Sequence, residues 1–338
     1  MIISQTPLRV SFFGGGTDIR DYYGVNGGVV FSATIDKYIY IIVKSRYDNK
    51  VVAHYSKREE VDHIDEIQHE IIREALRIAE IDCGIEITCI ADIPSKGSGL
   101  GSSSSFTVGL LNSLFTFKGD FKSPRELAEL ACKIEIDQLN EPIGKQDQYA
   151  AAFGGFRKYL FNKDSSVDIE SINISNSGYK LLNSYTMMFY TGIARKASSV
   201  LSDQKKNIGN NFDALDTLKK MAMTCEKEFL NMNIKKIGEM LDTSWDEKKK
   251  LSNKIYNSEI NMMYETAKKA GIYGGKLLGA GGGGYFLFLC PPGNRQKVRE
   301  ALKEYKELPV SFDKYGSRII LNVNDNCGFV DYKKVISA

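Results

Sequence analysis

Residues 94–105 read Pro94-Ser-Lys-Gly-Ser-Gly-Leu-Gly-Ser-Ser-Ser-Ser105, and they join an alternating apolar segment, 84–93, to an apolar helical pattern, 106–117. Glycines let a backbone approach an oxyanion closely, and the free N–H groups at the start of a helix point toward it. The order of strand, glycine-rich loop and helix therefore predicts an anion site. A flexible linker is the alternative, but regular apolar structure flanks the loop directly. It is not a Walker loop, because no GxxxxGK[ST] occurs in the chain.

The side chains of this loop add chemistry to its backbone. Ser102, Ser103 and Ser104 bring hydroxyl groups that suit phosphate or Mg²⁺, and Lys96 brings positive charge at the rim. We refer to residues 94–105 as the phosphate loop.

The composition of the whole chain limits the class of protein that contains this loop. The chain has 338 residues, a net charge of +3 and 43% hydrophobic residues, which predicts two domains or one large one and excludes a disordered protein. The charge is too small to favour nucleic acid or an acidic membrane face. No apolar run reaches the roughly 18–20 residues of a spanning helix, and no signal peptide is evident, so a cytoplasmic location is the default expectation. Six cysteines without a CxxC and three histidines give no zinc spacing.

Periodicity along the chain predicts a mixture of strands and helices. The segment 175–183 is polar and turn-rich, so it is a plausible domain junction, and the charge run 246–250 is expected to be a solvated helix face. Strands are expected over 28–35, 38–45, 50–54, 84–93, 184–190, 285–290 and 317–323, and helices over 63–81, 106–117, 124–139, 198–239, 248–269 and 295–304.

A second glycine-rich segment, Gly279-Ala-Gly-Gly-Gly-Gly284, contains the letters GxGxxG. The dinucleotide fingerprint needs a strand before it and a helix after it. An apolar strand follows here instead, so a Rossmann site is rejected. What remains is a tight turn that approaches another loop or a ligand, with a purely structural turn as the alternative.

A third segment, Arg9-Val-Ser-Phe-Phe-Gly-Gly-Gly-Thr-Asp18, places an arginine in an apolar strand and feeds a glycine turn that presents Thr17, Asp18 and Arg20. A buried arginine is costly unless a carboxylate or phosphate pairs with it. The alternative is an edge-strand arginine that reaches solvent.

Glu135 and Asp147 are the candidate functional carboxylates. Asp147 follows Pro142 and Gly144 at the start of a helix, where it could instead be an N-cap. Glu135 lies on a predicted helix, where the nearby Asp137 is the other candidate for the same role. The alternative for Glu135 is an ordinary surface carboxylate. Phosphoryl transfer needs a phosphate cradle, a carboxylate for Mg²⁺, a cation, and a carboxylate for the accepting hydroxyl. The three segments and these two acids supply all of them.

With these motifs in order, the sequence resembles the GHMP kinases. The resemblance rests on residues 6–18, 94–104 and 276–284, which span nearly the whole chain. It implies an α+β fold of two domains, 1–182 and 183–338, with the active site in the cleft between them and ATP bound by the first domain. It also implies an enzyme with ATP and Mg²⁺ as cofactors and a small molecule as the acceptor; it leaves the oligomeric state open.

The resemblance assigns roles by position. Asp147 matches the catalytic carboxylate, which removes a proton from the acceptor hydroxyl or only aligns it, and Arg9 matches the basic residue beside it. Ser103 and Glu135 match metal ligands, and Asp18 matches the sugar-contacting aspartate. The third motif is expected to pack against the phosphate loop. Nucleotide contacts are expected from Lys96, Gly97, Ser98, Gly99, Gly101, Ser102, Ser103 and Ser104, and substrate contacts from Thr17, Asp18, Arg20, Lys145, Arg195, Gly281 and Gly282.

Within this family the chain is most similar to the D-glycero-D-manno-heptose 7-phosphate kinases, on the evidence of the segments 14–18, 144–149 and 191–195. These enzymes phosphorylate the anomeric hydroxyl on the route to GDP-activated heptose, a precursor for capsule or lipopolysaccharide. Galactokinases have Gly-Glu-His-Thr-Asp where this chain has Gly14-Gly-Gly-Thr-Asp18, which puts galactose in doubt. The alternatives are an anomeric kinase of the fucose or galactose type, a non-catalytic nucleotide-binding relative, and a decarboxylase of the same superfamily.

Overall fold

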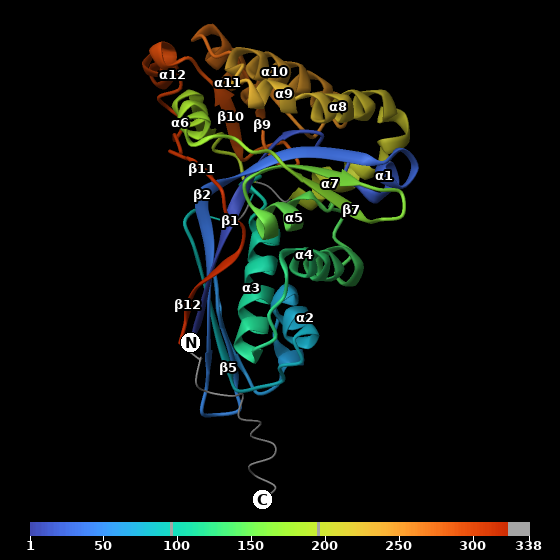
Figure 1. The fold of residues 1–338 in the computed structure, drawn as a ribbon, viewed down its shortest axis with the longest axis vertical. Coiled ribbons are helices and arrows are strands. Elements are labelled where there is room, and N and C mark those ends of the chain that lie inside the picture. Colours follow the sequence, from blue (N-terminus) through green and yellow to red (C-terminus); the bar gives the residue numbers. More distant parts are fainter. Residues whose placement is uncertain (95–96, 195–196, 324–338) are drawn as a thin grey trace, which may run out of the picture.

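A computed structural model describes residues 1–94, 97–194 and 197–323 of the chain. Helices pack on a large sheet and on a small one (Figure 1), so the predicted α+β class is confirmed. Within these residues the large sheet has nine strands: the path β12–β1–β2–β5–β3–β4, with β6 and β11 also paired to β2 and β7 paired to β6. Its strands are β1 (Ile2–Phe13), β2 (Gly28–Ser45), β3 (Val51–His54), β4 (Arg58–Val61), β5 (Ile85–Ala91), β6 (Phe156–Phe161), β7 (Val167–Ser171), β11 (Phe312–Asp313) and β12 (Arg318–Asn322).

Strand β2 connects the two ends of the large sheet. Its first residues pair with β6 and its last residues pair with β5, while β1 runs antiparallel beside most of its length. Two strands were expected over 28–35 and 38–45, and the structure shows one. The register between β1 and β2 shifts after Pro7, so a bulge takes up Asp36 and Lys37 and the strand continues.

Helix α3 (Ser102–Lys118) packs on β1 and β2 and is the central helix of the large sheet (Figure 1). Its buried residues run almost all round, because α2, α4 and α5 cover the sides that the sheet leaves open. The helices of this part are α1 (Arg20–Asn26), α2 (Glu70–Ile78), α4 (Pro124–Cys132), the π-helical turn Lys133–Gln138, α5 (Gln146–Phe153) and α6 (Asn176–Tyr185), with a 3₁₀ turn over Ile64–Glu66.

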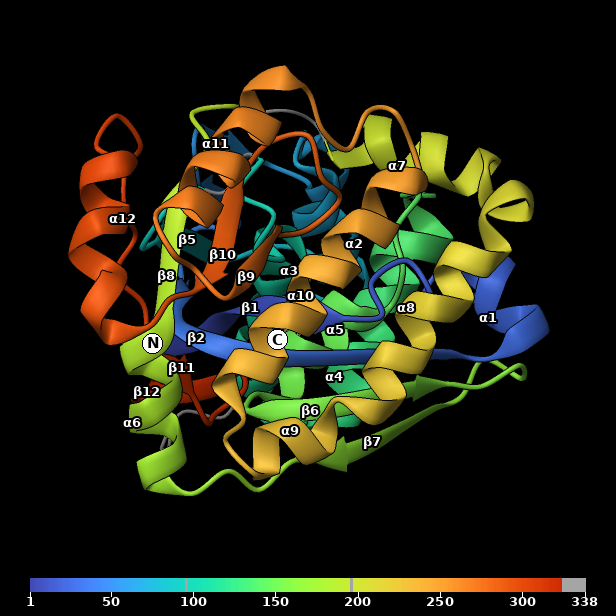
Figure 2. The same cartoon turned by 90° about the horizontal axis from the view of Figure 1, so that it is seen from above.

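The small sheet has the antiparallel order β8–β10–β9, and α10 and α11 lie over it when the molecule is seen from above (Figure 2). Trp245 of α10 is fully buried there, edge-on to Phe286 at a centroid distance of 5.7 Å, in the second of two hydrophobic clusters. The elements are β8 (Thr186–Tyr190), β9 (Gly274–Leu277), β10 (Tyr285–Leu289), α7 (Ala197–Lys206), α8 (Phe212–Thr224), α9 (Glu226–Leu230), α10 (Ile234–Lys250), α11 (Ser258–Lys269) and α12 (Arg295–Ala301), with 3₁₀ turns over Ile208–Asn211 and Pro292–Asn294.

Three elements expected after residue 174 differ in the structure. The helix expected over 248–269 is interrupted, because α10 ends at Lys250 and α11 begins at Ser258. The segment 175–183 is helical and not turn-rich, since it forms most of α6, where Ser175 caps the helix by accepting from Gly178 N and Leu182 is buried. The single helix expected over 198–239 is divided between α7, α8, α9 and α10. The break before α10 falls at Met232, whose φ of +53° lies in the left-handed region.

The division into residues 1–182 and 183–338 stays a prediction. Strands β11 and β12 come from the end of the chain and pair with β2 and β1, so the large sheet contains residues from both sides of that boundary. Among the helices that the structure describes, none combines the length and the hydrophobicity needed to cross a bilayer.

Candidate active site

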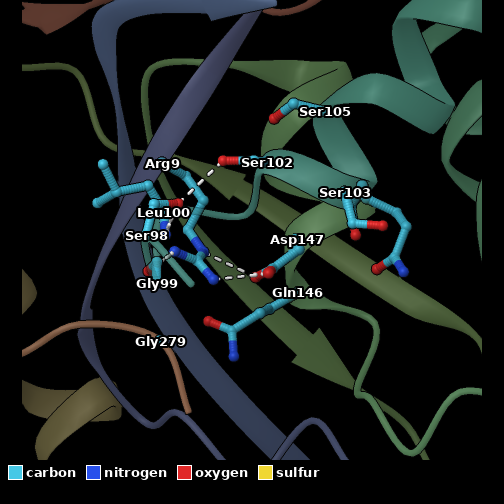
Figure 3. Close-up of polar contacts among 12 residues, drawn as sticks. Arg9, Ser98, Gly99, Leu100, Ser102, Ser103, Ser105, Gln146, Asp147 and Gly279 are labelled. Carbon is cyan, nitrogen blue, oxygen red and sulfur yellow. Dashed lines mark hydrogen bonds and ion pairs between the residues drawn. The ribbon is translucent and has the colours of Figure 1, made fainter. Parts of the chain in front are cut away.

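The predicted pair Arg9 and Asp147 forms a two-pronged ion pair (Figure 3). Nε of Arg9 donates to Oδ1 of Asp147 at 2.7 Å, and Nη2 donates to Oδ2 at 2.6 Å. Arg9 lies in β1 and is 4% exposed, so the alternative of a solvated edge-strand arginine is wrong. Asp147 lies in the first turn of α5, where Lys145 is the N-cap residue, so Asp147 is not the N-cap.

The phosphate loop lies directly against this ion pair. Nη1 of Arg9 donates to the carbonyl of Gly99 at 2.7 Å, and the main-chain N–H of Arg9 donates to the carbonyl of Leu100 at 3.0 Å. A Cβ built on Gly101 would lie 3.3 Å from Oδ2 of Asp147. Gly101 has a φ of +76°, a left-handed conformation that turns the chain into α3. The predicted anion site and the predicted catalytic carboxylate therefore meet.

The third glycine segment packs on the phosphate loop, which confirms the expected contact. A Cβ on Gly279 would lie 2.5 Å from the Cα of Gly99, and the N–H of Tyr285 donates to the carbonyl of Ser98 at 3.3 Å. Gly281 and Gly282 are buried against Ile255 instead of lining the space in front of Asp147. Their expected contact with substrate stays a prediction.

Glu135 is buried beside the start of α3, 1% exposed, so the alternative of a surface carboxylate is wrong. Its competitor Asp137 is exposed. Glu135 accepts hydrogen bonds from Ser103 Oγ at 2.9 Å, Ser104 Oγ at 2.8 Å and Gln148 Nε2 at 2.6 Å. Burial raises the pKa of this carboxyl above its ordinary value, while the three donors oppose that rise.

Glu135 owes its position to a change in helix type. The helix continues from α4 through the π-helical turn Lys133–Gln138, and the wider turn rotates its side chains relative to a regular α-helix. Helical periodicity does not reveal such a turn, so the sequence predicted the helix but not this irregularity.

The remaining residues of the phosphate loop have mixed placements. Ser102 Oγ and Ser98 Oγ share a hydrogen bond of 3.0 Å, and both side chains are buried. Ser103 is exposed at the start of α3, and Gly97 is half-buried. Lys96 lies outside the described residues, so its expected contact with nucleotide stays a prediction.

The glycine turn after β1 holds Thr17 and Asp18 in buried positions. Thr17 Oγ1 donates to the carbonyl of Gly14 at 2.8 Å and accepts from the N–H of Val29 at 3.0 Å, so its hydroxyl is engaged in the turn. Asp18 is 2% exposed and lines a cavity that Arg9 and Asp147 also line. Burial, reinforced by the charge of Asp147, raises the pKa of Asp18 above its ordinary value.

Of the basic residues expected to contact substrate, Arg20 and Lys145 do not line that cavity. Nζ of Lys145 donates to the carbonyl of Ser165 at 2.8 Å and lies 5.5 Å from the centroid of the Tyr23 ring. Arg20 is exposed at the first residue of α1. Arg195 lies outside the described residues. A contact between any of these residues and a substrate phosphate stays a prediction.

Two buried lysines near the site were missed by sequence reasoning. Lys276 of β9 is 3% exposed and donates to the carbonyl of Phe12 at 2.9 Å. Burial, with a smaller contribution from Arg9, lowers its pKa to about 7. Lys248 of α10 is 8% exposed and donates to the carbonyls of Leu277, at 2.8 Å, and Gly279. The expectation that 246–250 is a solvated face is therefore wrong for Lys248.

Two cavities flank the phosphate loop. The first, which we call the Asp147 cavity, is lined by Arg9, Asp18, Gln146, Asp147, Lys276 and Gly279 among others. The second, the His69 cavity, has a volume of about 720 Å³ and reaches Ser102 and Ser103 at the start of α3. Its walls are mainly apolar and aromatic: Tyr55, His69 and Phe106 are in ring contact, with centroid distances of 4.7 and 5.2 Å. Burial lowers the pKa of His69.

Comparison with known proteins agrees with this geometry. Residues 66–155 match the family described as GHMP kinases N terminal domain, and residues 225–308 match GHMP kinases C terminal. The D-glycero-alpha-D-manno-heptose 7-phosphate kinase of Campylobacter jejuni is 30% identical over 320 residues, covering 90% of this chain and 93% of that protein. A galactokinase of Pyrococcus furiosus is 25% identical over 351 residues, with 90% and 93% covered.

Solved structures show the same fold. A D-glycero-D-manno-heptose 1-phosphate kinase from Bacteroides thetaiotaomicron has a TM-score of 0.81 at 24% identity, with 95% of this chain and 99% of that chain covered. The galactokinase of Lactococcus lactis complexed with galactose has a TM-score of 0.71 at 22% identity, with 94% of each chain covered. With both family domains matched and a relative that is similar over nearly its full length, the chain belongs to the GHMP kinase family and is a kinase.

Proposed function

We propose that this protein transfers the γ-phosphoryl group of ATP to the anomeric hydroxyl of D-glycero-D-manno-heptose 7-phosphate. The product is the 1,7-bisphosphate, on the route to GDP-activated heptose. The observation that carries the proposal is the contact of Gly101 with the Arg9–Asp147 pair. Through this contact the phosphate loop, which has a cavity on either side, lies next to the candidate catalytic carboxylate. The choice of sugar rests on the similarity to the Campylobacter jejuni enzyme and on the absence of side chains at Gly15 and Gly16, where galactokinases carry Glu and His.

The two cavities suit the two substrates. The His69 cavity has the size and the apolar lining of a small-molecule site, so it is the place for the adenine ring. From there the triphosphate follows the start of α3, where the first N–H groups of the helix have no partner within the helix. The γ-phosphate then lies next to Asp147, and the sugar occupies the Asp147 cavity.

The transfer itself needs alignment and charge more than covalent help. Asp147 accepts a hydrogen bond from the anomeric hydroxyl and takes its proton. The hydroxyl oxygen then forms a bond to the γ-phosphorus, and the bond from that phosphorus to the bridging oxygen breaks, which leaves ADP. Arg9 keeps both oxygens of Asp147 in a fixed plane through its two-pronged contact.

Glu135 and Ser103 fit a magnesium ion. Mg²⁺ prefers oxygen ligands and is usually bound by one or two carboxylates together with substrate phosphates and water. Among the described residues, no three His, Cys, Asp or Glu side chains are grouped so that they could hold a metal ion by themselves. Bound there, the ion supplies positive charge against the charge that develops on the phosphate oxygens.

A substrate panel tests the proposal. The purified protein is incubated with ATP, Mg²⁺ and, in turn, heptose 7-phosphate, galactose, fucose and mannose. NMR then identifies the phosphorylated carbon. The proposal expects phosphate on C1 of the heptose 7-phosphate, with a kcat/KM well above those of the free hexoses. Efficient phosphorylation of a free hexose without reaction of the 7-phosphate would favour the fucose or galactose type and refute the heptose assignment.

A further inference from the structure

We infer that Gln146, with its side-chain amide held by Asp18, accepts a hydrogen bond from the sugar hydroxyl next to the one that is phosphorylated. The inference rests on the proposed function only in that the acceptor is a sugar. It changes the part that Asp18 is expected to play, from a direct contact with the sugar to the orientation of Gln146.

Asp18 is already surrounded by protein groups. Its Oδ1 accepts from the N–H of Gly16 at 3.0 Å and from Nε2 of Gln146 at 3.2 Å, and its Oδ2 accepts from the N–H of Gln146 at 3.2 Å. A Cβ on Gly144 would lie 2.0 Å from that Oδ2, so Gly144 packs on the carboxylate directly. Both oxygens of Asp18 are thus engaged by donors of the protein itself.

The hydrogen bond to Asp18 fixes the orientation of the side-chain amide of Gln146. A carboxylate accepts and does not donate when ionised, so the NH₂ end of the amide must face Asp18 and the carbonyl end must face away. Oε1 of Gln146 is buried and has no hydrogen-bond partner among the described residues. Ser11 Oγ, another buried atom without a described partner, lines the same cavity. A buried acceptor without a donor is costly, and a ligand hydroxyl relieves that cost.

Gln146 lies where a neighbouring hydroxyl must be. It directly precedes Asp147 in the first turn of α5, and Figure 3 shows its side chain beside Asp147 and Arg9. Hydroxyls on adjacent ring carbons lie side by side. When Asp147 holds the anomeric hydroxyl, the group that can reach Gln146 is therefore the 2-hydroxyl. A sugar without that group leaves Oε1 unpaired, so the pair of residues selects for it.

A comparison of two enzyme variants with two sugars, analysed as a double-mutant cycle, tests the inference. We measure kcat/KM of the wild type and of Gln146→Met with the parent sugar and with its 2-deoxy analogue. Methionine has a similar length and no acceptor oxygen. For the wild type, kcat/KM is expected to fall by about 10- to 100-fold when the 2-hydroxyl is removed. For Gln146→Met, kcat/KM should be nearly equal for the two sugars. Gln68→Met, which changes an exposed glutamine that does not line the Asp147 cavity, should discriminate like the wild type.

A second variant addresses the part of Asp18 as a positioning residue. In Asp18→Asn the new amide can donate as well as accept, so the amide of Gln146 is no longer held in one orientation. Discrimination against the 2-deoxy sugar should fall by several-fold, while the KM for ATP stays as in the wild type. A loss of structure alone would lower kcat/KM for both sugars equally and would not change the ratio of the two values.

The outcomes separate this inference from the proposed function. If the protein prefers another sugar of the panel, the heptose assignment fails, and the same cycle is run with that sugar and its 2-deoxy form. If Gln146→Met discriminates as strongly as the wild type, the inference is overturned even when heptose 7-phosphate is the substrate. If no sugar of the panel is phosphorylated, both fail.

Discussion

Arg9 holds both carboxylate oxygens of Asp147 in one plane, and its remaining nitrogen reaches the carbonyl of Gly99. One guanidinium thus connects the carboxylate to the phosphate loop. A lysine offers a point charge without this planar fork, so it could not make the three contacts in the same geometry. The position of Asp147 relative to a bound triphosphate is therefore set by β1, not only by α5.

Replacement of Asp147 by asparagine should separate binding from turnover. The amide fills the same space and can still accept from Arg9, but it is a poor acceptor for a proton. We expect kcat to fall by at least about 100-fold while the affinity for ATP, measured by calorimetry, stays close to that of the wild type. Substantial turnover by Asp147→Asn would contradict its catalytic role.

Glu135→Gln should change the response to magnesium. The variant keeps the volume and much of the hydrogen bonding around Ser103 and Ser104 but removes the negative charge. We expect the Mg²⁺ concentration for half-maximal activity to rise by about 10-fold or more. The neighbouring exposed residue offers a matched control, because Asp137→Asn removes an equal charge outside the site. Equal magnesium curves for the wild type and Glu135→Gln would exclude Glu135 as a ligand.

Lys276 should make the stability of the fold depend on pH. Its pKa is about 7 in the folded chain and 10.5 ordinarily. Between these values the unfolded chain binds more protons, so the free energy of unfolding should rise with pH, by at most ~1.4 kcal/mol per unit.

Denaturant unfolding at pH 7 and pH 9 checks this expectation. The free energy of unfolding should be higher at pH 9 than at pH 7 in the wild type and in Lys220→Met, which changes an exposed lysine. This increase should be absent in Lys276→Met. The same increase in Lys276→Met would show that another group causes it.

Gly279→Ala should damage the contact between the two glycine-rich segments. Gly279 has a φ of +66°, and a Cβ there would lie 2.5 Å from the Cα of Gly99. Gly119 has a similar φ of +77° but nothing within 4 Å of its Cβ position. Gly119→Ala should therefore cost only the backbone strain, about 1 kcal/mol of unfolding free energy.

The clash should make Gly279→Ala more costly than this control, by roughly 1–3 kcal/mol, and should raise the KM for ATP. Unfolding curves and steady-state kinetics of both variants test the difference. Equal effects of the two substitutions would mean that the segments separate easily.

Arg9 and the phosphate loop could be predicted because each of them breaks a local rule. Arg9 is a charge in an apolar strand, and the phosphate loop collects glycine and serine between two apolar elements. Such features are unfavourable unless they have a partner, so the sequence alone indicates that partners exist. It also pointed to Glu135 and Asp147, although each had an ordinary local alternative.

Other residues carried no such signal. Lys248 lies in a run of charges that is typical of a solvated face, and only the fold places it under the carbonyls of Leu277 and Gly279. Gln146 is uncharged, and the role that we infer for it depends on a contact with Asp18, which is distant in the sequence. The bulge in β2 and the helical conformation of α6 likewise depend on tertiary packing that local propensity does not describe.

The pairing of β12 with β1 has a consequence for synthesis of the chain on the ribosome. Ile2 and Ile3 pair with Asn322 and Leu321, which come far later in the chain. Until those residues leave the exit tunnel, the outer side of β1 offers unpaired N–H and C=O groups along this stretch. An open edge of this kind recruits foreign strands. This edge of the large sheet is thus expected to be completed only after the rest of the sheet has been synthesised.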